Sequence, residues 1–387
     1  MEFDLSEDQA ALRDAAAALL DSFDLKGSVR SLVGKGTPIG AQAAKGSGTS
    51  EESSTAQAEF DHELWEAMAD QGWLAVTLPA AAGGLGLGTV ELAVLCEQLG
   101  RRVAPAPYIG TVLALDALDA LSGSSRHPGG LAQLREKLAC GSAVGSLAWA
   151  LGKGKVEVRY EGSTPLLYGR PDPALFAPLA DVSVVICDDA LFAVELAQPI
   201  RPDPLEAMDR TRVLGWIDLE GVAATPIGGR PEAQRMIDLA ATATAAEMLG
   251  GAEQVLQMSV EYAKDRVQFG RPIGSFQAIK HRLADALVDV EAMRSSVYYA
   301  AWCAQGSPSE RALAASAAKA WCSEAAKRVM ASGLQVHGGI GFTWEHDLHL
   351  YMKRSQLDQV SFGDACWHRD RMAKILRAKV SSGESLF

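Results

Sequence analysis

Polar and charged side chains gather around a predicted corner between two long helices, in the segment 265–281. Arg266, Gln268 and Gln277 lie close together there, and Pro272, flanked by two glycines, excludes one straight helix through the segment. A guanidinium, amide side chains and the free N–H groups of a helix N-terminus together bind phosphate, or the polar edge of a nucleotide. The sequence therefore predicts an anion or nucleotide site at this corner.

A second candidate site is the glycine-containing run 335–342, Gln-Val-His-Gly-Gly-Ile-Gly-Phe, at the end of a later predicted helix. Glycine lets the backbone approach a ligand that a Cβ would hold off. This run and the pattern Arg-x-x-Phe-Gly-x-x-Ile-x-x-Phe-Gln, from Arg266 to Gln277, resemble two motifs of the acyl-CoA dehydrogenase family.

The resemblance implies that both motifs hold the ADP half of an FAD that belongs mainly to a neighbouring subunit. The residues carried over as FAD-binding are Arg266, Gln268, Phe269, Gln277, Gln335, Val336, His337, Gly338 and Gly339.

The residue that should remove the substrate α-proton is missing from both family positions. Members oxidise an acyl-CoA to a trans-2-enoyl-CoA, and a glutamate acts as the base. The resemblance places that glutamate at Phe362 or Ala240, and neither side chain accepts a proton. Glu247 and Asp364 lie nearby as substitutes. Each also has a structural interpretation: Glu247 as an ion-pair partner across the bundle, and Asp364 as the N-cap of the next helix.

The motifs expected around the flavin ring are also missing. The region 145–154 has no Glu-Pro-x-x-Gly-Ser turn, and 165–171 has no Trp-x-Thr. Trp149 and Tyr168 could stack on a ring, although aromatic residues in a β-domain more often belong to the core. The chain thus keeps the ADP-side motifs and lacks those of the isoalloxazine side.

A subunit of an α2β2 hetero-oligomer explains this combination, with a homologous partner supplying the flavin pocket and the glutamate. The resemblance implies an acyl-CoA substrate, such as the CoA thioester of a steroid side chain, and an electron-transfer flavoprotein as electron acceptor. One alternative is a complete homomeric dehydrogenase with Glu247 or Asp364 as base. Others are a non-catalytic structural or CoA-binding paralogue and a flavin monooxygenase of the same fold.

Composition narrows the class of protein. The chain has 387 residues, 48% of them hydrophobic, and a formal net charge of −12, which disfavours nucleic-acid binding. No apolar run is long enough to cross a membrane, and the acidic N-terminus lacks a signal-peptide pattern, so a cytoplasmic protein is expected. Six scattered cysteines predict reduced thiols, with neither a disulfide framework nor a metal site.

Hydrophobic periodicity predicts helices, then strands, then helices. The expected domains are 1–130, all-helical with a mobile loop at 34–58; 131–227, a β-domain; and 228–387, helical again. The resemblance implies an α+β fold with an N-terminal helical domain, a middle β-barrel and a C-terminal four-helix bundle. The predicted helices before the β-domain are 5–23, 60–71, 89–102 and 109–121, and the predicted strands include 156–160, 182–186, 191–195 and 212–217.

Overall fold

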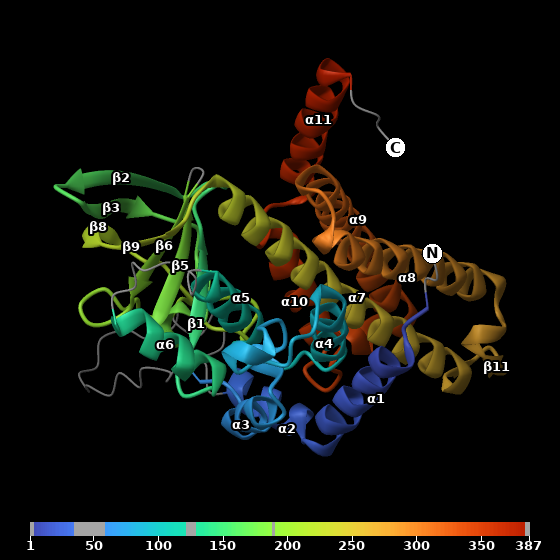
Figure 1. The fold of residues 1–387 in the computed structure, drawn as a ribbon. Helices are drawn as coiled ribbons and strands as arrows, with labels where there is room; N and C mark the ends of the chain where they lie inside the picture. The colour runs from blue at the N-terminus through green and yellow to red at the C-terminus, as the bar shows by residue number, and fades with distance from the viewer. Residues whose placement is uncertain (1–3, 35–58, 121–128, 188–189, 384–387) are drawn as a thin grey trace, which may run out of the picture.

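The computed structural model describes residues 4–34, 59–120, 129–187 and 190–383. Helices, strands and a second set of helices follow one another along the chain, and the strands gather on one side of the molecule (Figure 1). The predicted loop at 34–58 lies outside the described residues, apart from Gly34.

The N-terminal part is helical, as predicted. Ser6 caps the first helix and forms a capping box with Gln9. A helix at 25–34 was not predicted; its start carries a local signal, because Asp24 Oδ1 accepts a hydrogen bond from the Gly27 N–H at 3.0 Å. The helices are α1 (Glu7–Ser22), α2 (Leu25–Gly34), α3 (His62–Asp70), α4 (Thr89–Arg101), α5 (Tyr108–Asp119) and α6 (Gly129–Ala139), with short 3-10 turns η2 (Trp73–Ala75) and η3 (Ala80–Ala82).

The middle part forms two larger sheets, ordered β1-β5-β6-β9 and β2-β3-β8, and a small pair β4-β7. β1 is parallel to β5, and the other pairs are antiparallel. The strands are β1 (Gly145–Trp149), β2 (Lys155–Glu161), β3 (Thr164–Arg170), β4 (Ala174–Leu175), β5 (Val182–Cys187), β6 (Ala190–Glu195), β7 (Leu214–Gly215), β8 (Leu219–Ala223) and β9 (Thr225–Gly228), with the turn η4 (Ala177–Leu179).

The prediction of a strand over 212–217 was wrong for most of its length. Only β7 is extended there. Asp209 accepts hydrogen bonds from both the N–H and the hydroxyl of Thr211, and this local turn competes with strand pairing.

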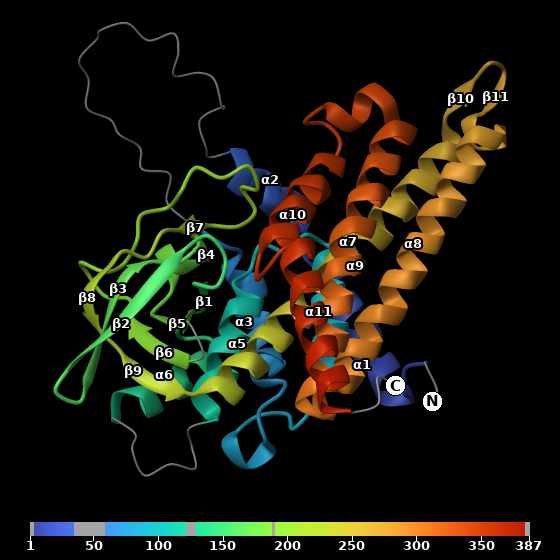
Figure 2. The same cartoon turned by 90° about the horizontal axis from the view of Figure 1, so that it is seen from above.

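The C-terminal part is a bundle in which α9 packs against four other helices. The hairpin β10–β11 lies at the end of the bundle far from the β-domain (Figures 1 and 2). The elements are α7 (Arg230–Asp265), β10 (Val267–Gln268), β11 (Arg271–Pro272), η5 (Ile273–Ser275), α8 (Gln277–Trp302), η6 (Cys303–Gln305), α9 (Pro308–His337), η7 (Gly338–Phe342), α10 (Leu348–Val360) and α11 (Ala365–Ser382).

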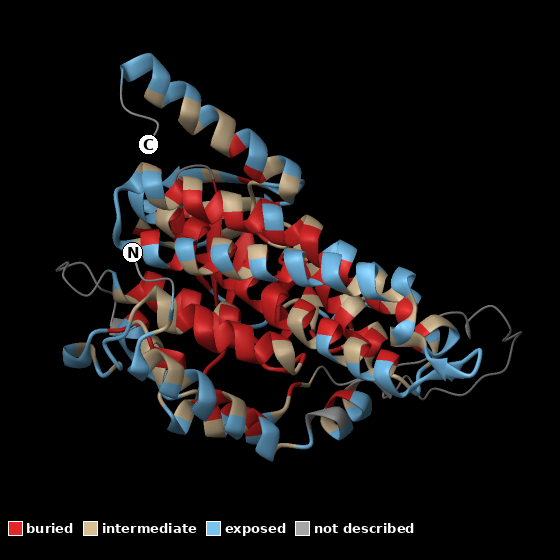
Figure 3. Ribbon diagram, turned by 90° about the vertical axis from the view of Figure 1, so that its right-hand side faces the viewer, coloured by how far each residue is buried: buried red, intermediate tan, exposed pale blue. Residues whose placement is uncertain are grey.

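Buried residues run through the centre of the bundle (Figure 3), whereas α11 is exposed or half-buried except at His368 and Arg371. The N-terminal part joins the bundle through a close crossing of α4 and α7. A Cβ on Gly100 would lie 2.1 Å from the Glu247 carbonyl oxygen, and one on Gly250 would lie 1.8 Å from that of Glu97. The two helices therefore touch backbone to backbone.

Two expectations from composition can be compared with the described residues. Within 4–34, 59–120, 129–187 and 190–383, no helix has the length and apolarity needed to cross a membrane. All six cysteines are free in the structure. The described residues contain no group of three or more His, Cys, Asp or Glu side chains that could hold a metal ion.

Candidate functional site

The predicted corner between α7 and α8 is a short β-hairpin. Val267 pairs with Pro272 and Gln268 with Arg271. The loop between the strands has two residues, Phe269 (φ 53°) and Gly270 (φ 79°). Two-residue hairpin loops require positive φ, which glycine adopts freely and phenylalanine rarely does. The hairpin ends the long helix and presents its side chains beyond the bundle.

These side chains are turned to solvent. Arg266, Gln268 and Gln277 are exposed, and Phe269 is 91% exposed. The Arg266 guanidinium makes no ion pair or hydrogen bond with another residue of the described part of the chain. The N-terminus of α8 at Gln277 has no side-chain cap. A cation and uncapped N–H groups on the same corner suit a phosphate-bearing ligand.

The second motif forms the end of α9. Val336 and His337 are buried, while Gln335 and Gly339 are exposed. Gly338 has φ 62° and ψ −139°, a conformation that essentially only glycine adopts. A Cβ on Gly338 or Gly339 would meet no atom of the described residues within 4 Å. Backbone conformation therefore explains Gly338, whereas nothing in the described chain explains Gly339.

The two motifs meet through a ring stack. Tyr262, in the last turn of α7, stacks on His337 with ring centroids 4.6 Å apart and planes 25° apart. His337 Nδ1 lies 2.8 Å from the Gly333 carbonyl oxygen, so Nδ1 carries the proton and Nε2 is an acceptor. Burial lowers the pKa of His337, which keeps the ring neutral. Nε2 is buried and has no partner in the described residues.

Both positions of the family's base are filled by apolar side chains. Ala240 is fully buried in α7. Phe362, in the turn between α10 and α11, is 5% exposed. Its ring lies edge-on to Trp149 with centroids 6.3 Å apart, and Trp149 also meets Trp367 edge-on at 5.2 Å. Trp149 therefore belongs to an aromatic cluster, formed with Phe362 and Trp367, between β1 and the bundle.

The other ring candidate, Tyr168, lies on β3 in a different sheet from Trp149. The Arg159 guanidinium lies 4.5 Å from the centre of its ring. The structure therefore does not bring Trp149 and Tyr168 together as a pair facing one ligand.

The two substitute carboxylates are both engaged. Glu247 is 3% exposed and accepts hydrogen bonds from Arg212 and, at 2.8 Å, from Arg354. Asp364 is exposed and accepts from the Trp367 N–H at 2.8 Å, as the N-cap of α11. These are the contacts expected from the structural interpretation of each acid.

Glu247 belongs to a buried ion-pair network that the sequence did not reveal. Arg354 on α10 also pairs with Asp209 at 2.9 Å, and Arg212 pairs with Asp358 at 2.8 Å. Burial, and next the charge of Glu247, raise the pKa of Asp358 to about 7, although Arg212 and Arg354 oppose the shift. The network ties α7 and α10 to the segment before β7. No local feature of the sequence indicates which acids Arg212 and Arg354 meet.

Another buried cation also escaped prediction. Lys319, within the alanine-rich α9, is fully buried and donates to the Gly363 carbonyl oxygen at 2.8 Å. Burial lowers its pKa to about 8. The sequence signal is a single lysine within an alanine-rich helix, a pattern that is consistent with burial of the lysine.

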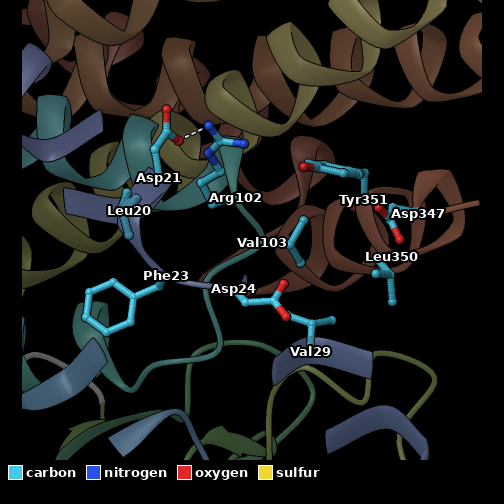
Figure 4. Close-up of a pocket in the computed structure, with 10 residues that line it drawn as sticks. All are labelled: Leu20, Asp21, Phe23, Asp24, Val29, Arg102, Val103, Asp347, Leu350 and Tyr351. Atoms are coloured by element: carbon cyan, nitrogen blue, oxygen red, sulfur yellow. Dashed lines mark hydrogen bonds and ion pairs between the residues drawn. The ribbon is translucent and has the colours of Figure 1, made fainter. Parts of the chain in front are cut away.

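A cleft of about 390 Å³ opens elsewhere, between the end of α1, α2, the end of α4 and α10 (Figure 4). Its floor is apolar, and Arg102 pairs with Asp21 across one wall. None of the predicted site residues lines it.

Comparison with known proteins decides the family. The model of the acyl-CoA dehydrogenase C-terminal domain matches residues 228–376, and that of the N-terminal domain matches residues 45–122. Acyl-CoA dehydrogenase IpdE2 of Mycobacterium tuberculosis is 38% identical over 299 residues, which cover 76% of this chain and 81% of the relative. The chain belongs to the acyl-CoA dehydrogenase family.

Two solved structures are similar to this chain over nearly its whole length. The ChsE4-ChsE5 complex from Mycobacterium tuberculosis has a TM-score of 0.83 and 27% identity, covering 100% of both chains. A variant of the Tcur3481-Tcur3483 steroid ACAD has a TM-score of 0.83 and 28% identity, covering 97% of this chain and 99% of that one.

Membership of the acyl-CoA dehydrogenase family confirms the resemblance and the fold class predicted from the sequence. It also confirms the predicted enzyme class, a flavin-dependent acyl-CoA dehydrogenase, and FAD as the cofactor. The assignment of particular residues to FAD or to proton transfer stays a prediction.

Proposed function

We propose that this chain is one subunit of a hetero-oligomeric acyl-CoA dehydrogenase that desaturates an acyl-CoA thioester between its α and β carbons. Its Arg266 corner and its 335–339 run contribute the ADP side of a shared FAD site. A homologous partner subunit contributes the flavin-ring pocket and the catalytic glutamate. The observation that carries the proposal is a contrast. Arg266 is exposed and has no partner among the described residues, whereas Phe362 is buried and packs against Trp149.

The ADP side is supported by groups that have no use within the described chain. Arg266 would pair with the pyrophosphate, and Gln277 at the start of α8 would add amide donors. Gly339 is open on the side where a Cβ would point, as expected of backbone approached by a ligand. His337 Nε2 is a buried acceptor without a partner among the described residues, and a donor of the cofactor would satisfy it. When bound, FAD supplies the acceptor for the substrate hydride.

The contacts of Glu247 and Asp364 support the partner's role in proton transfer. A base must reach the α-carbon with an oxygen that is able to accept a proton. Both oxygens of Glu247 accept hydrogen bonds from the buried Arg212 and Arg354. The Asp364 carboxylate caps the N-terminus of α11 by accepting a hydrogen bond from the Trp367 N–H. Neither carboxylate is available in this arrangement, so the base comes from another chain.

The name of the ChsE4-ChsE5 complex describes two different chains in one assembly, and the Tcur3481-Tcur3483 structure is described as a steroid ACAD. By analogy, we infer an α2β2 assembly and the CoA thioester of a steroid side chain as substrate. The electron acceptor would be an electron-transfer flavoprotein, and the compartment the cytoplasm.

The test is co-expression of this chain with the homologous dehydrogenase subunit encoded by a neighbouring gene. A tag on this chain should recover a yellow complex that contains both subunits and fewer flavins than subunits. Expressed alone, the chain should be colourless or poorly soluble. A yellow homotetramer of this chain alone that desaturates an acyl-CoA would overturn the proposal and return Glu247 and Asp364 as candidate bases.

A further inference from the structure

The buried Lys319 forms hydrogen bonds with the backbone at the turn between α10 and α11. Its Nζ donates to the carbonyl oxygens of Gly363 at 2.8 Å and Gln359 at 3.2 Å, and lies 3.4 Å from Ser323 Oγ. Lys319 forms no ion pair with a carboxylate of the described residues. Its hydrogen bonds are therefore directed at the backbone on either side of Phe362.

Burying an ammonium group is costly unless its hydrogen bonds are made. An apolar side chain of similar length would fill the same space without that cost. The cation at Lys319 lies at the carboxyl end of α10, where the helix dipole favours positive charge. The cost of burying the amine and its place at the carboxyl end of α10 both indicate that Lys319 serves to fix the position of the turn.

The turn adopts a conformation that needs such support. Phe362 has φ 55°, which is uncommon and strained for a residue other than glycine. Its carbonyl oxygen lies 3.0 Å from His368 Nε2, so that nitrogen is the donor. Asp364 caps the next helix on the other side. Lys319 and His368 donate hydrogen bonds to backbone carbonyls around Phe362, and Asp364 accepts one from a backbone N–H.

The conformation of the turn decides where the Phe362 ring goes. The ring is buried and meets Trp149 of β1 edge-on, so one side chain bridges the bundle and the β-domain. The Trp149–Trp367 contact extends the same cluster. A turn free to move would withdraw the ring and open this space to solvent.

We propose that Lys319 is a positioning residue that locks the α10–α11 turn with Phe362 against Trp149, so that this subunit keeps its own site closed. The biological meaning rests on the proposed function, in which the working flavin site uses the partner's pocket. The role of Lys319 in fixing the turn is measured separately, by hydrogen exchange.

The first experiment compares Lys319→Met with Lys327→Met in the complex with the partner subunit. Lys327 lies on the same helix and is exposed. Hydrogen exchange is followed by mass spectrometry in peptides covering 357–368, which contain the hydrogen-bonded N–H groups of Ser361 and Trp367. Lys319→Met should accelerate exchange there by roughly ten- to hundredfold, while peptides from the rest of α9 and Lys327→Met stay at the wild-type rate.

A second variant separates the effect of the Lys319 hydrogen bonds from that of the Phe362 ring. Phe362→Ala should leave exchange in 357–368 nearly unchanged, because the Lys319 contacts are to backbone. The fluorescence of Trp149 is isolated by subtracting the signal of the matching Trp149→Phe variant, both in the wild type and in Phe362→Ala. Acrylamide should quench Trp149 more strongly in Phe362→Ala than in the wild type. Lys319→Gln keeps a hydrogen-bond donor without the charge, so it should show intermediate exchange, and it replaces the methionine variant if that protein does not fold.

Unchanged exchange in 357–368 for Lys319→Met, or an equal acceleration throughout α9 to α11, would overturn the lock. Unchanged quenching of Trp149 in Phe362→Ala would overturn the closed site. Flavin content and turnover of the same samples report on the proposed function alone. An active, yellow preparation of this chain by itself would refute that function without altering the exchange result.

Discussion

Tyr262 and His337 stack ring on ring where the end of α7 meets the end of α9, with centroids 4.6 Å apart. This contact places the Arg266 corner, which begins just after Tyr262, beside the glycine turn that follows His337. Two motifs about seventy residues apart in the sequence thus become one surface at the end of the bundle. We propose that this surface receives the ADP half of FAD.

Replacing Arg266 with alanine should weaken flavin retention in the assembled enzyme by roughly ten- to hundredfold, because a charge-assisted contact contributes about 1.5–3 kcal/mol. Flavin absorbance after gel filtration at several dilutions measures this. Arg377→Ala, on the exposed side of α11, is the control and should retain flavin normally. Full occupancy in Arg266→Ala would remove the residue from the site.

The two glycines should respond differently to valine. Gly338→Val should destabilise the protein itself, since a β-branched residue tolerates φ 62° poorly. Gly339→Val should fold normally and lose flavin, because no described atom lies near its Cβ position. Thermal unfolding and flavin content of both variants separate these effects. Normal flavin content in Gly339→Val would contradict a close approach of cofactor to that backbone.

Glu247→Gln should destabilise the fold, because it leaves Arg212 and Arg354 facing a neutral amide. Breaking a buried ion pair typically costs about 3–5 kcal/mol. Asp364→Asn should change stability little, since asparagine also caps a helix N-terminus. Urea unfolding of the complex measures both. A fully stable Glu247→Gln protein that binds flavin but has lost α-proton exchange would instead identify Glu247 as the base.

The helix crossing offers a comparison between adjacent residues. Gly250→Ala places a Cβ 1.8 Å from the Glu97 carbonyl oxygen, so it should destabilise the fold by about 1–3 kcal/mol or more. Gly251→Ala meets its nearest atom at 3.7 Å and should stabilise α7 by up to ~1 kcal/mol through helix propensity. Opposite shifts in melting temperature are expected; equal shifts would mean that the backbone contact does not limit packing.

Lys319 should make stability depend on alkaline pH. Burial lowers its pKa from 10.5 to about 8 in the folded protein. Between these two values the unfolded chain binds more protons than the folded one, so stability rises with pH. The free energy of unfolding of the wild type, measured relative to Lys319→Met by denaturant unfolding, should therefore increase from pH 8 towards pH 10. A relative stability that falls over this range would show that the folded protein favours the ammonium form.

Local signals in the sequence predicted the elements well. Pro272, with Gly270 and Gly274 nearby, marked the corner, Asp364 was recognised as a candidate N-cap, and helical periodicity marked the bundle. α2 was overlooked, although Asp24 at its start accepts from a backbone N–H. Each of these features depends on neighbours a few residues away, which a single sequence displays directly.

The candidate site was only partly predictable because its decisive contacts join distant segments. Arg212 looked like part of a strand, and nothing local connects it with Glu247 or Asp358. Motif resemblance brought the Arg266 corner and the 335–339 run together on family grounds. The aromatic contact of Phe362 with Trp149 needs two domains to be docked, and no periodicity in either segment specifies that.

The crossing of α4 and α7 has a consequence for how the chain can vary. Because peptide groups touch at Gly100 and Gly250, the separation of the two helices is set by atoms common to every residue. Exchanges among the surrounding core side chains leave that separation unchanged as long as both glycines remain. Distant homologues could therefore differ widely in their cores and still superimpose here, which makes this crossing a suitable reference point for aligning subunits whose pockets have diverged.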